Sequence, residues 1–168
     1  TGRSEEALLH YRLALAADPD YAMAHKNLGL MLRVRGEKEA AATHLVTAAR
    51  LQPSDKEAHL IAGQALRDVG QWQAAAQSYR RAVALDSSFA AAHLNLGVSL
   101  EMLGETSAAL AAYQTALEAR PSLAGAAFNM GRLLQDMRRV DEAIARYEHA
   151  VLLNPDFVEA LCNLGLAY

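Results

Sequence analysis

The sequence has little positive charge, few aromatic side chains and almost no cysteine. Its 168 residues carry 16 Lys and Arg against 19 Asp and Glu, which gives a formal net charge of −3. Phosphate backbones are bound through a concentrated excess of Lys and Arg, so this composition argues against a nucleic-acid partner. Because Cys162 is the one cysteine, this chain alone forms neither a disulfide nor a thiolate metal cluster.

Long apolar runs are also missing. The most apolar stretch, residues 89–100, is interrupted by His93 and Asn95, so we expect no membrane span. The first ten residues carry acidic side chains where a signal peptide needs a basic start and an apolar core. We therefore expect a cytoplasmic protein, although a periplasmic location is compatible with the same features. Arg outnumbers Lys 13 to 3 and alanine is abundant, which favours a bacterial source.

Proline and β-branched residues are scarce, whereas alanine is plentiful. The chain has 4 prolines, and alanine fills 36 positions. Alanine and leucine lose little side-chain entropy in a helix, and the β-branched residues that favour strands are few. The composition predicts an all-α protein without a sheet.

A period of 34 residues runs through the whole sequence, and a period of this length is typical of repeat proteins. Four of its points are prolines and the fifth is Ser87. The same spacing separates four further sets, with Leu45 standing once in the tyrosine set. The sets are Pro19, Pro53, Pro121 and Pro155; Gly29, Gly63, Gly97, Gly131 and Gly165; Ala7, Ala41, Ala75, Ala109 and Ala143; Ala14, Ala48, Ala82, Ala116 and Ala150; and Tyr11, Tyr79, Tyr113 and Tyr147.

Each period contains two stretches with helical spacing of apolar residues, for example residues 90–103 and 107–120. Gly36, Gly70 and Gly104 follow the first stretch, where a positive φ ends a helix at least cost. Arg138 takes this place once, and we expect strain there. Proline ends the second stretch. We interpret the unit as a helical hairpin whose mid-helix glycine and two alanines let the two backbones cross closely.

The spacing of Leu96-Gly97 and Leu100, then Ala109, Tyr113 and Ala116, then Pro121 resembles the tetratricopeptide repeat. The resemblance covers essentially the whole chain and implies a right-handed α-solenoid, or superhelix, of helical hairpins. His25, His59 and His93 depart from the family pattern, which often has a bulky residue at their position. Ser87 and Arg138 depart from it as well, because they replace the usual proline and the glycine between the helices.

Repeat boundaries follow from the period. We predict a single array over residues 1–168 with four complete repeats. They cover residues 22–55, 56–89, 90–123 and 124–157, preceded by the second helix of a partial repeat in 1–21 and followed by the first helix of another in 158–168. The half repeats leave Leu161 and Leu164 without a partner helix, which suggests head-to-tail self-association.

The resemblance implies that the first helices line a concave groove that binds a partner protein or peptide. The candidate binding residues are Asn27, Asn95, Asn129, Asn163, Lys26, Arg33, Gln64, Arg67 and Arg132. The asparagine row is similar to that of the superhelical domain in O-linked N-acetylglucosamine transferases. Two roles remain open for it, contact with a peptide backbone or a bond to the neighbouring helix.

The arginines have the same two interpretations. Arg33, Arg67 and Arg132 can hold acidic groups of a ligand by forked hydrogen bonds. They can equally form ion pairs with carboxylates of the chain itself, namely Glu101, Asp68 and Asp136.

The histidine row and the tyrosine row are interpreted as structural rather than metal-binding or catalytic. Helices of successive repeats lie about 8–10 Å apart, which is too far for the histidine row to share one zinc ion, so we expect hydrogen-bonded histidines and no metal. The tyrosines are expected in the core.

We find no catalytic or cofactor-binding motif and predict a non-enzymatic interaction scaffold. The alternatives are a substrate-recruiting region of a larger enzyme such as a glycosyltransferase, and a self-assembling scaffold.

Overall fold

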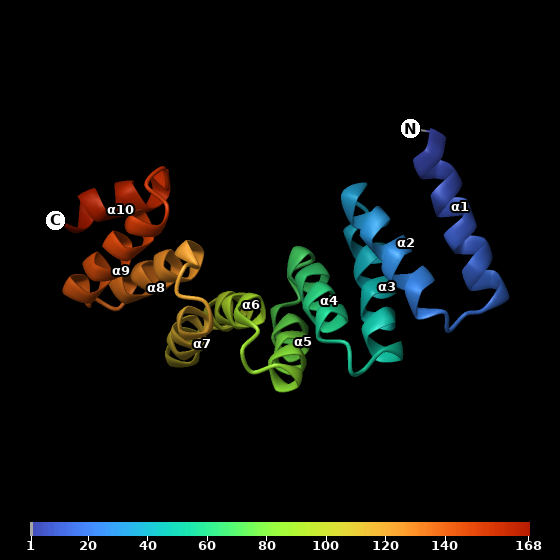
Figure 1. Ribbon diagram of the computed structural model, residues 1–168, viewed down its shortest axis with the longest axis horizontal. Coiled ribbons are helices and arrows are strands. Elements are labelled where there is room, and N and C mark those ends of the chain that lie inside the picture. The colour runs from blue at the N-terminus through green and yellow to red at the C-terminus, as the bar shows by residue number, and fades with distance from the viewer. Residues whose placement is uncertain (1) are drawn as a thin grey trace. The chain divides into compact units, whose positions relative to one another are not determined.

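The computed structural model describes residues 2–168 and shows ten helices and no strand in that range (Figure 1). The predicted all-α fold is confirmed, and the helices form a solenoid. Their bounds are α1 (Gly2–Ala17), α2 (Ala22–Val34), α3 (Lys38–Leu51), α4 (Lys56–Asp68), α5 (Trp72–Leu85), α6 (Ala90–Met102), α7 (Thr106–Ala119), α8 (Ala124–Asp136), α9 (Val140–Leu153) and α10 (Val158–Ala167).

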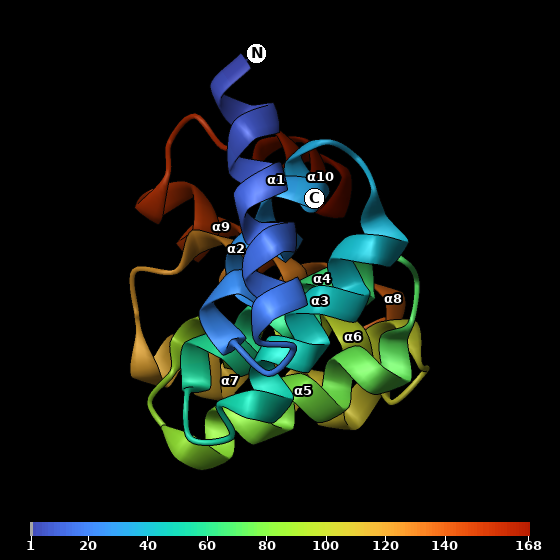
Figure 2. The same ribbon diagram turned by 90° about the vertical axis from the view of Figure 1, so that its right-hand side faces the viewer.

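The helices fall into two compact units. The first ends at Ser87 and holds α1 to α5, and the second begins at Ser88 and holds α6 to α10. In the first unit each helix packs against the next, with the closest pairs in the hairpins α2–α3 and α4–α5. The second unit repeats this arrangement in α6–α7 and α8–α9, and α10 packs against α9 and α8. Figure 2 shows α1 beside α2 in the first unit.

The turns inside the hairpins all use a residue with positive φ. The φ angle is 81° at Gly36, 74° at Gly70, 77° at Gly104 and 63° at Arg138. At Gly104 two backbone bonds close the helix, because the amides of residues 104 and 105 donate to the carbonyls of Glu101 and Leu100 at 2.9 Å. The turn at Arg138 has the same pair of bonds. Its non-glycine residue in the left-handed region therefore carries the strain expected from the sequence.

Three of the mid-helix glycines make room for a tyrosine ring. A Cβ added to Gly97 would lie 2.5 Å from the ring of Tyr113, and one added to Gly131 would lie 2.8 Å from the ring of Tyr147. Gly63 faces Tyr79 in the same way, at 2.5 Å. A larger side chain at these glycines would overpack the contact, as expected from the sequence, and the group that it would meet is an aromatic ring of the second helix.

The core between the two helices of each hairpin consists mainly of the predicted tyrosines and alanines. Tyr79, Tyr113 and Tyr147 are completely buried, as expected, and Tyr11 is half-buried. The alanines from 41 to 150 in the two alanine rows are at most 1% exposed. Small side chains allow the helices to approach closely, so a ring of this size fits without a cavity.

The outer helices of the two units expose apolar side chains. Leu9 and Leu13 on α1 are each 55% exposed, and Leu161 on α10 is 44% exposed. Leu164, expected to lack a partner helix, instead packs against the buried cluster of α8 and α9. Head-to-tail association through these helices stays a prediction. No helix within residues 2–168 is both long and apolar enough to cross a membrane.

We predict that alanine at Gly97 and alanine at Gly125 have opposite effects on stability. Gly97→Ala should lower the free energy of unfolding by roughly 1–3 kcal/mol, because the buried ring of Tyr113 has to move. Gly125 lies in α8 with no atom near an added Cβ, so Gly125→Ala should leave the free energy unchanged or raise it by up to about 1 kcal/mol. Urea titrations followed by circular dichroism measure both. Equal stability of the two variants would contradict the proposed role of Gly97.

Candidate functional site

The nine predicted binding residues all lie on the first helices of the hairpins or on α10, and all are half-buried. Lys26, Asn27 and Arg33 belong to α2, and Gln64 and Arg67 belong to α4. The second unit holds the remaining four, which are Asn95 on α6, Asn129 and Arg132 on α8, and Asn163 on α10. The structure joins Arg33, Gln64 and Arg67 around Asp68 in the first unit, and it pairs Arg132 with Glu101 in the second.

The cluster of the first unit is centred on Asp68 of α4. Arg33 on α2 donates from Nε to Asp68 Oδ2 at 2.6 Å and from Nη1 to Gln64 Oε1 at 3.3 Å. Arg67 Nη2 lies 3.7 Å from the other oxygen of Asp68. The guanidinium of Arg33 thus joins two successive first helices, and the carboxylate of Asp68 balances both arginines.

The cluster of the second unit is centred on Glu101 of α6, whose side chain is 15% exposed. Its Oε1 pairs with Arg132 Nη2 of α8 at 2.5 Å, and its Oε2 accepts a hydrogen bond from the hydroxyl of Tyr113 at 2.9 Å. Burial and the nearby charge of Glu101 raise the pKa of the Tyr113 hydroxyl, so this group remains a neutral donor. For Arg33 and Arg132 the ion-pair interpretation is the one that the structure shows, whereas no ion pair of Asp136 is found in the described part of the chain.

The asparagines of the row differ in whether their side chains form hydrogen bonds within the chain. Asn95 Nδ2 donates to the carbonyl of Ala91 at 2.8 Å, and Asn163 Nδ2 lies 3.5 Å from the hydroxyl of Tyr147. That hydroxyl donates to Gln135 Oε1 at 2.6 Å. Within residues 2–168 the side chains of Asn27 and Asn129 form no hydrogen bond, so their amides are open to a ligand.

The histidine row is hydrogen-bonded to the turns that precede it. His25 Nε2 lies 2.9 Å from the carbonyl oxygen of Pro19, and His59 Nε2 lies 3.1 Å from that of Pro53. The hydrogen-bonded role predicted for these two histidines is confirmed. No group of three or more His, Cys, Asp or Glu suited to a metal ion occurs among the described residues.

His25 also pairs with His44 of α3, which the sequence reasoning missed. The two Nδ1 atoms lie 2.9 Å apart. Because Nε2 of His25 donates to a carbonyl, its Nδ1 accepts, and His44 supplies the proton. Burial lowers the pKa of His44, and the charges of His25 and Arg12 lower it further. The period could not reveal this pair, because Ser78 and Ala112 occupy the positions equivalent to His44 in the next two hairpins.

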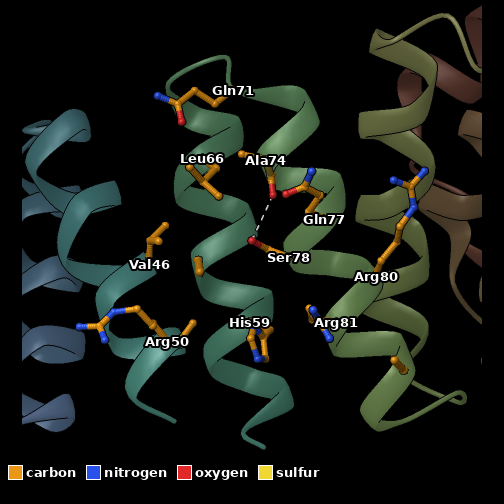
Figure 3. Close-up of a pocket in the computed structure, with 13 residues that line it drawn as sticks. Val46, Arg50, His59, Leu66, Gln71, Ala74, Gln77, Ser78, Arg80 and Arg81 are labelled. Atoms are coloured by element: carbon orange, nitrogen blue, oxygen red, sulfur yellow. Dashed lines mark hydrogen bonds between the residues drawn. The ribbon is translucent and has the colours of Figure 1, made fainter. Parts of the chain in front are cut away.

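A pocket of about 740 Å³ lies over α4 between α3 and α5 (Figure 3). His59, Ala62 and Leu66 of α4 line it. Gln64 and Asp68 project from the other side of α4, given 3.6 residues per turn. None of the nine predicted residues lines this pocket. Its lining residues Arg50 and Arg81 could not be found from the period, because Ala84 and Thr115 occupy the positions 34 residues later.

Comparison with known proteins identifies the repeat. A family model described as tetratricopeptide repeat matches residues 1–56, 34–87 and 60–124, and one described as TPR repeat matches residues 139–168. No curated protein sequence matches the chain.

Three solved structures are similar over most of this chain. The crystal structure of MamA is 26% identical with a TM-score of 0.86, and the match covers 94% of this chain and 92% of MamA. YrrB, described as a TPR protein with an unusual peptide-binding site, is 25% identical with a TM-score of 0.87, and the match covers 96% of this chain and 84% of YrrB. A fragment of MamA from Desulfovibrio magneticus RS-1 is 24% identical with a TM-score of 0.78, over 87% of this chain and 82% of the fragment.

The hydroxyls of the core tyrosines should differ in their contributions to stability. Tyr113→Phe should lower the free energy of unfolding by about 1.5–3 kcal/mol, because it removes a hydrogen bond to the charged carboxylate of Glu101. The hydroxyl of Tyr79 is buried and has no hydrogen-bond partner among the described residues, so Tyr79→Phe should be neutral or stabilising. Thermal unfolding of the two variants measures the difference. Destabilisation by Tyr79→Phe equal to that by Tyr113→Phe would contradict it.

The histidine pair predicts a pH dependence of stability. The pKa of His44 is lower in the folded chain than its usual value of 6.5, so the unfolded chain binds more protons as the pH falls below about 7. Stability should therefore fall as the pH drops from about 7.5 to 5.5. His44→Ser copies the residue at position 78 and should flatten this slope. Urea titrations at several pH values check it, and an unchanged slope in the variant would contradict the assignment to His44.

Proposed function

We propose that this chain, which belongs to the tetratricopeptide repeat family, is a protein-interaction scaffold that holds an extended peptide of a partner across its first helices. The proposed contact surfaces are α2 with α4 in the first unit, and α6, α8 and α10 in the second. The proposal assigns no catalytic step to the chain. The description of the similar protein YrrB as peptide-binding supports it.

The observation that carries the proposal is the row of asparagine side chains, which recur on neighbouring helices. In the second unit α8 packs against both α6 and α10, and each of the three helices presents one asparagine. Packed helices lie about 8–10 Å apart, and an extended peptide advances about 3.3 Å per residue. Successive asparagines therefore match peptide groups about three residues apart. An amide donates and accepts at once, which suits backbone groups irrespective of sequence.

The two charged clusters set a chemical condition on the ligand. Arg33 and Arg132 already hold carboxylates of the chain, so an acidic ligand group must compete with Asp68 or Glu101. Lys26, by contrast, forms no ion pair within the described residues. We therefore propose that the amides supply most of the contact and that Lys26, Gln64 and the arginines adjust the preference among peptides.

The test is the double variant Asn95→Ala with Asn129→Ala. With labelled extended peptides of mixed sequence as the probe, its affinity should fall roughly tenfold, the equivalent of about 1.4 kcal/mol in lost hydrogen bonds. Its melting temperature should fall only slightly, because the bond that Asn95 loses runs to Ala91 of its own helix. In nuclear magnetic resonance spectra of the unmodified chain, the side-chain amide signals of Asn95 and Asn129 should shift on adding peptide.

Asn163→Ala is the matched control, because its amide lies near the hydroxyl of Tyr147 and part of its effect should appear as lost stability. A double variant that melts much earlier but binds the peptides with unchanged affinity would show that the amides serve the fold and would refute the proposal.

A further inference from the structure

The groove over α4 is a second surface with its own chemistry, separate from the proposed peptide face. Its floor consists of α4 residues, including Ala62 and Leu66, and its walls belong to α3 and α5. A smaller cavity of about 390 Å³ shares Val46, Leu66 and Gln71 with it. The two cavities therefore form one continuous groove with an apolar floor, and the larger one has the volume of typical ligand pockets, about 300–1,000 Å³.

One end of this groove is strongly cationic. Arg50, Arg80 and Arg81 line the larger cavity, and no acidic residue does, in a chain whose net charge is −3. Arg50 and Arg81 lie at the same end as His59, and Gln71 lies at the opposite end (Figure 3).

Arg50 and Arg81 have at most weak partners within the described part of the chain. Arg50 comes no closer than 3.9 Å to Asp20, and the two side chains are 68% and 77% exposed, which makes this a weak surface pair. Arg81 is exposed and has no ion pair in the described range. Both guanidinium groups can therefore meet an external carboxylate at little cost.

The repeat does not require an open cationic groove. At the positions 68 residues later, on α7, α8 and α9, Leu117 replaces Ala49 and Met130 replaces Ala62. Glu118 and Glu148 stand in place of Arg50 and Arg80. The same fold therefore accepts larger floor residues and the opposite charge, so the small side chains and arginines between α3 and α5 are a local property.

We propose that this groove binds a segment of a partner protein in which acidic residues flank one or two large apolar side chains. The apolar side chains would occupy the floor over Ala62 and Leu66, and the carboxylates would form forked hydrogen bonds with Arg50 and Arg81. The apolar floor favours a peptide over a nucleic acid, which has no aliphatic side chains to bury. The inference is independent of the peptide face proposed above.

The test uses an array of short synthetic peptides as the probe. Their central positions are varied over Leu, Met and Phe, and their flanking positions are all Glu, all Gln or all Lys. The full chain should bind the Glu series best and the Lys series worst, and the binding should weaken as salt is added. The tightest Glu peptide is then measured in solution by fluorescence anisotropy.

The discriminating variant is Arg50→Glu combined with Arg81→Glu. It should bind the Glu peptide at least roughly tenfold more weakly, because two favourable charge pairs become repulsive, and it should gain affinity for the matched Lys peptide. That gain requires a folded protein, so it separates a lost site from a lost fold. The control is Arg120→Glu combined with Arg146→Glu, which makes the same change of charge at residues that line neither cavity and should bind the Glu peptide nearly as the unmodified chain does.

Four results would overturn the proposal. The first is equal binding of the Glu and Lys series, and the second is loss of Glu-peptide binding in the variant Asn95→Ala with Asn129→Ala but not in the charge-reversed one. The third is tighter binding of a single-stranded oligonucleotide than of the Glu peptide. The fourth is a dimer of the chain that charge reversal abolishes.

Discussion

The packing of one tyrosine ring against one glycine determines the geometry of three of the four hairpins, whereas in α2–α3 Leu45 faces Gly29. Where the first helix has Gly97, the ring of Tyr113 from the second helix occupies the space that a side chain would need. The rings of Tyr79 and Tyr147 pack in the same way. Because all three are completely buried and interiors are close-packed, ring and glycine fix the distance between the two helices. The positions of the side chains on the first helices follow from it.

The same tyrosines link the core to the polar surface of the first helices. The hydroxyl of Tyr113 donates to Glu101, which also pairs with Arg132. The hydroxyl of Tyr147 donates to Gln135, and Asn163 approaches it from α10. In the first unit Asp68 takes the central place and Tyr79 is left without a partner among the described residues. One hairpin pattern thus supports clusters that differ in charge and in bonding.

The period of the sequence predicted most of the fold and part of the site. It located the hairpins, the turns with positive φ at Gly36, Gly70 and Gly104, and the buried tyrosines, because each recurs at a fixed spacing and its role depends only on backbone geometry. It also placed the nine candidate residues on the first helices. Which of them contact one another depends on side-chain directions, and these are not periodic. The bond between Arg33 and Asp68 joins residues 35 apart, and the pair of His25 and His44 has no counterpart in the other hairpins.

The turn at Arg138 affects how the hairpins of this chain can be used as building blocks. A synthetic array made from copies of α6 and α7 would have Gly104 at every turn, whereas copies of α8 and α9 would have Arg138 there, with a φ of 63° each time. The conformational penalty would then grow with the number of modules, at roughly 1–2 kcal/mol per copy. Long tandem arrays should therefore be assembled from the glycine-containing hairpin.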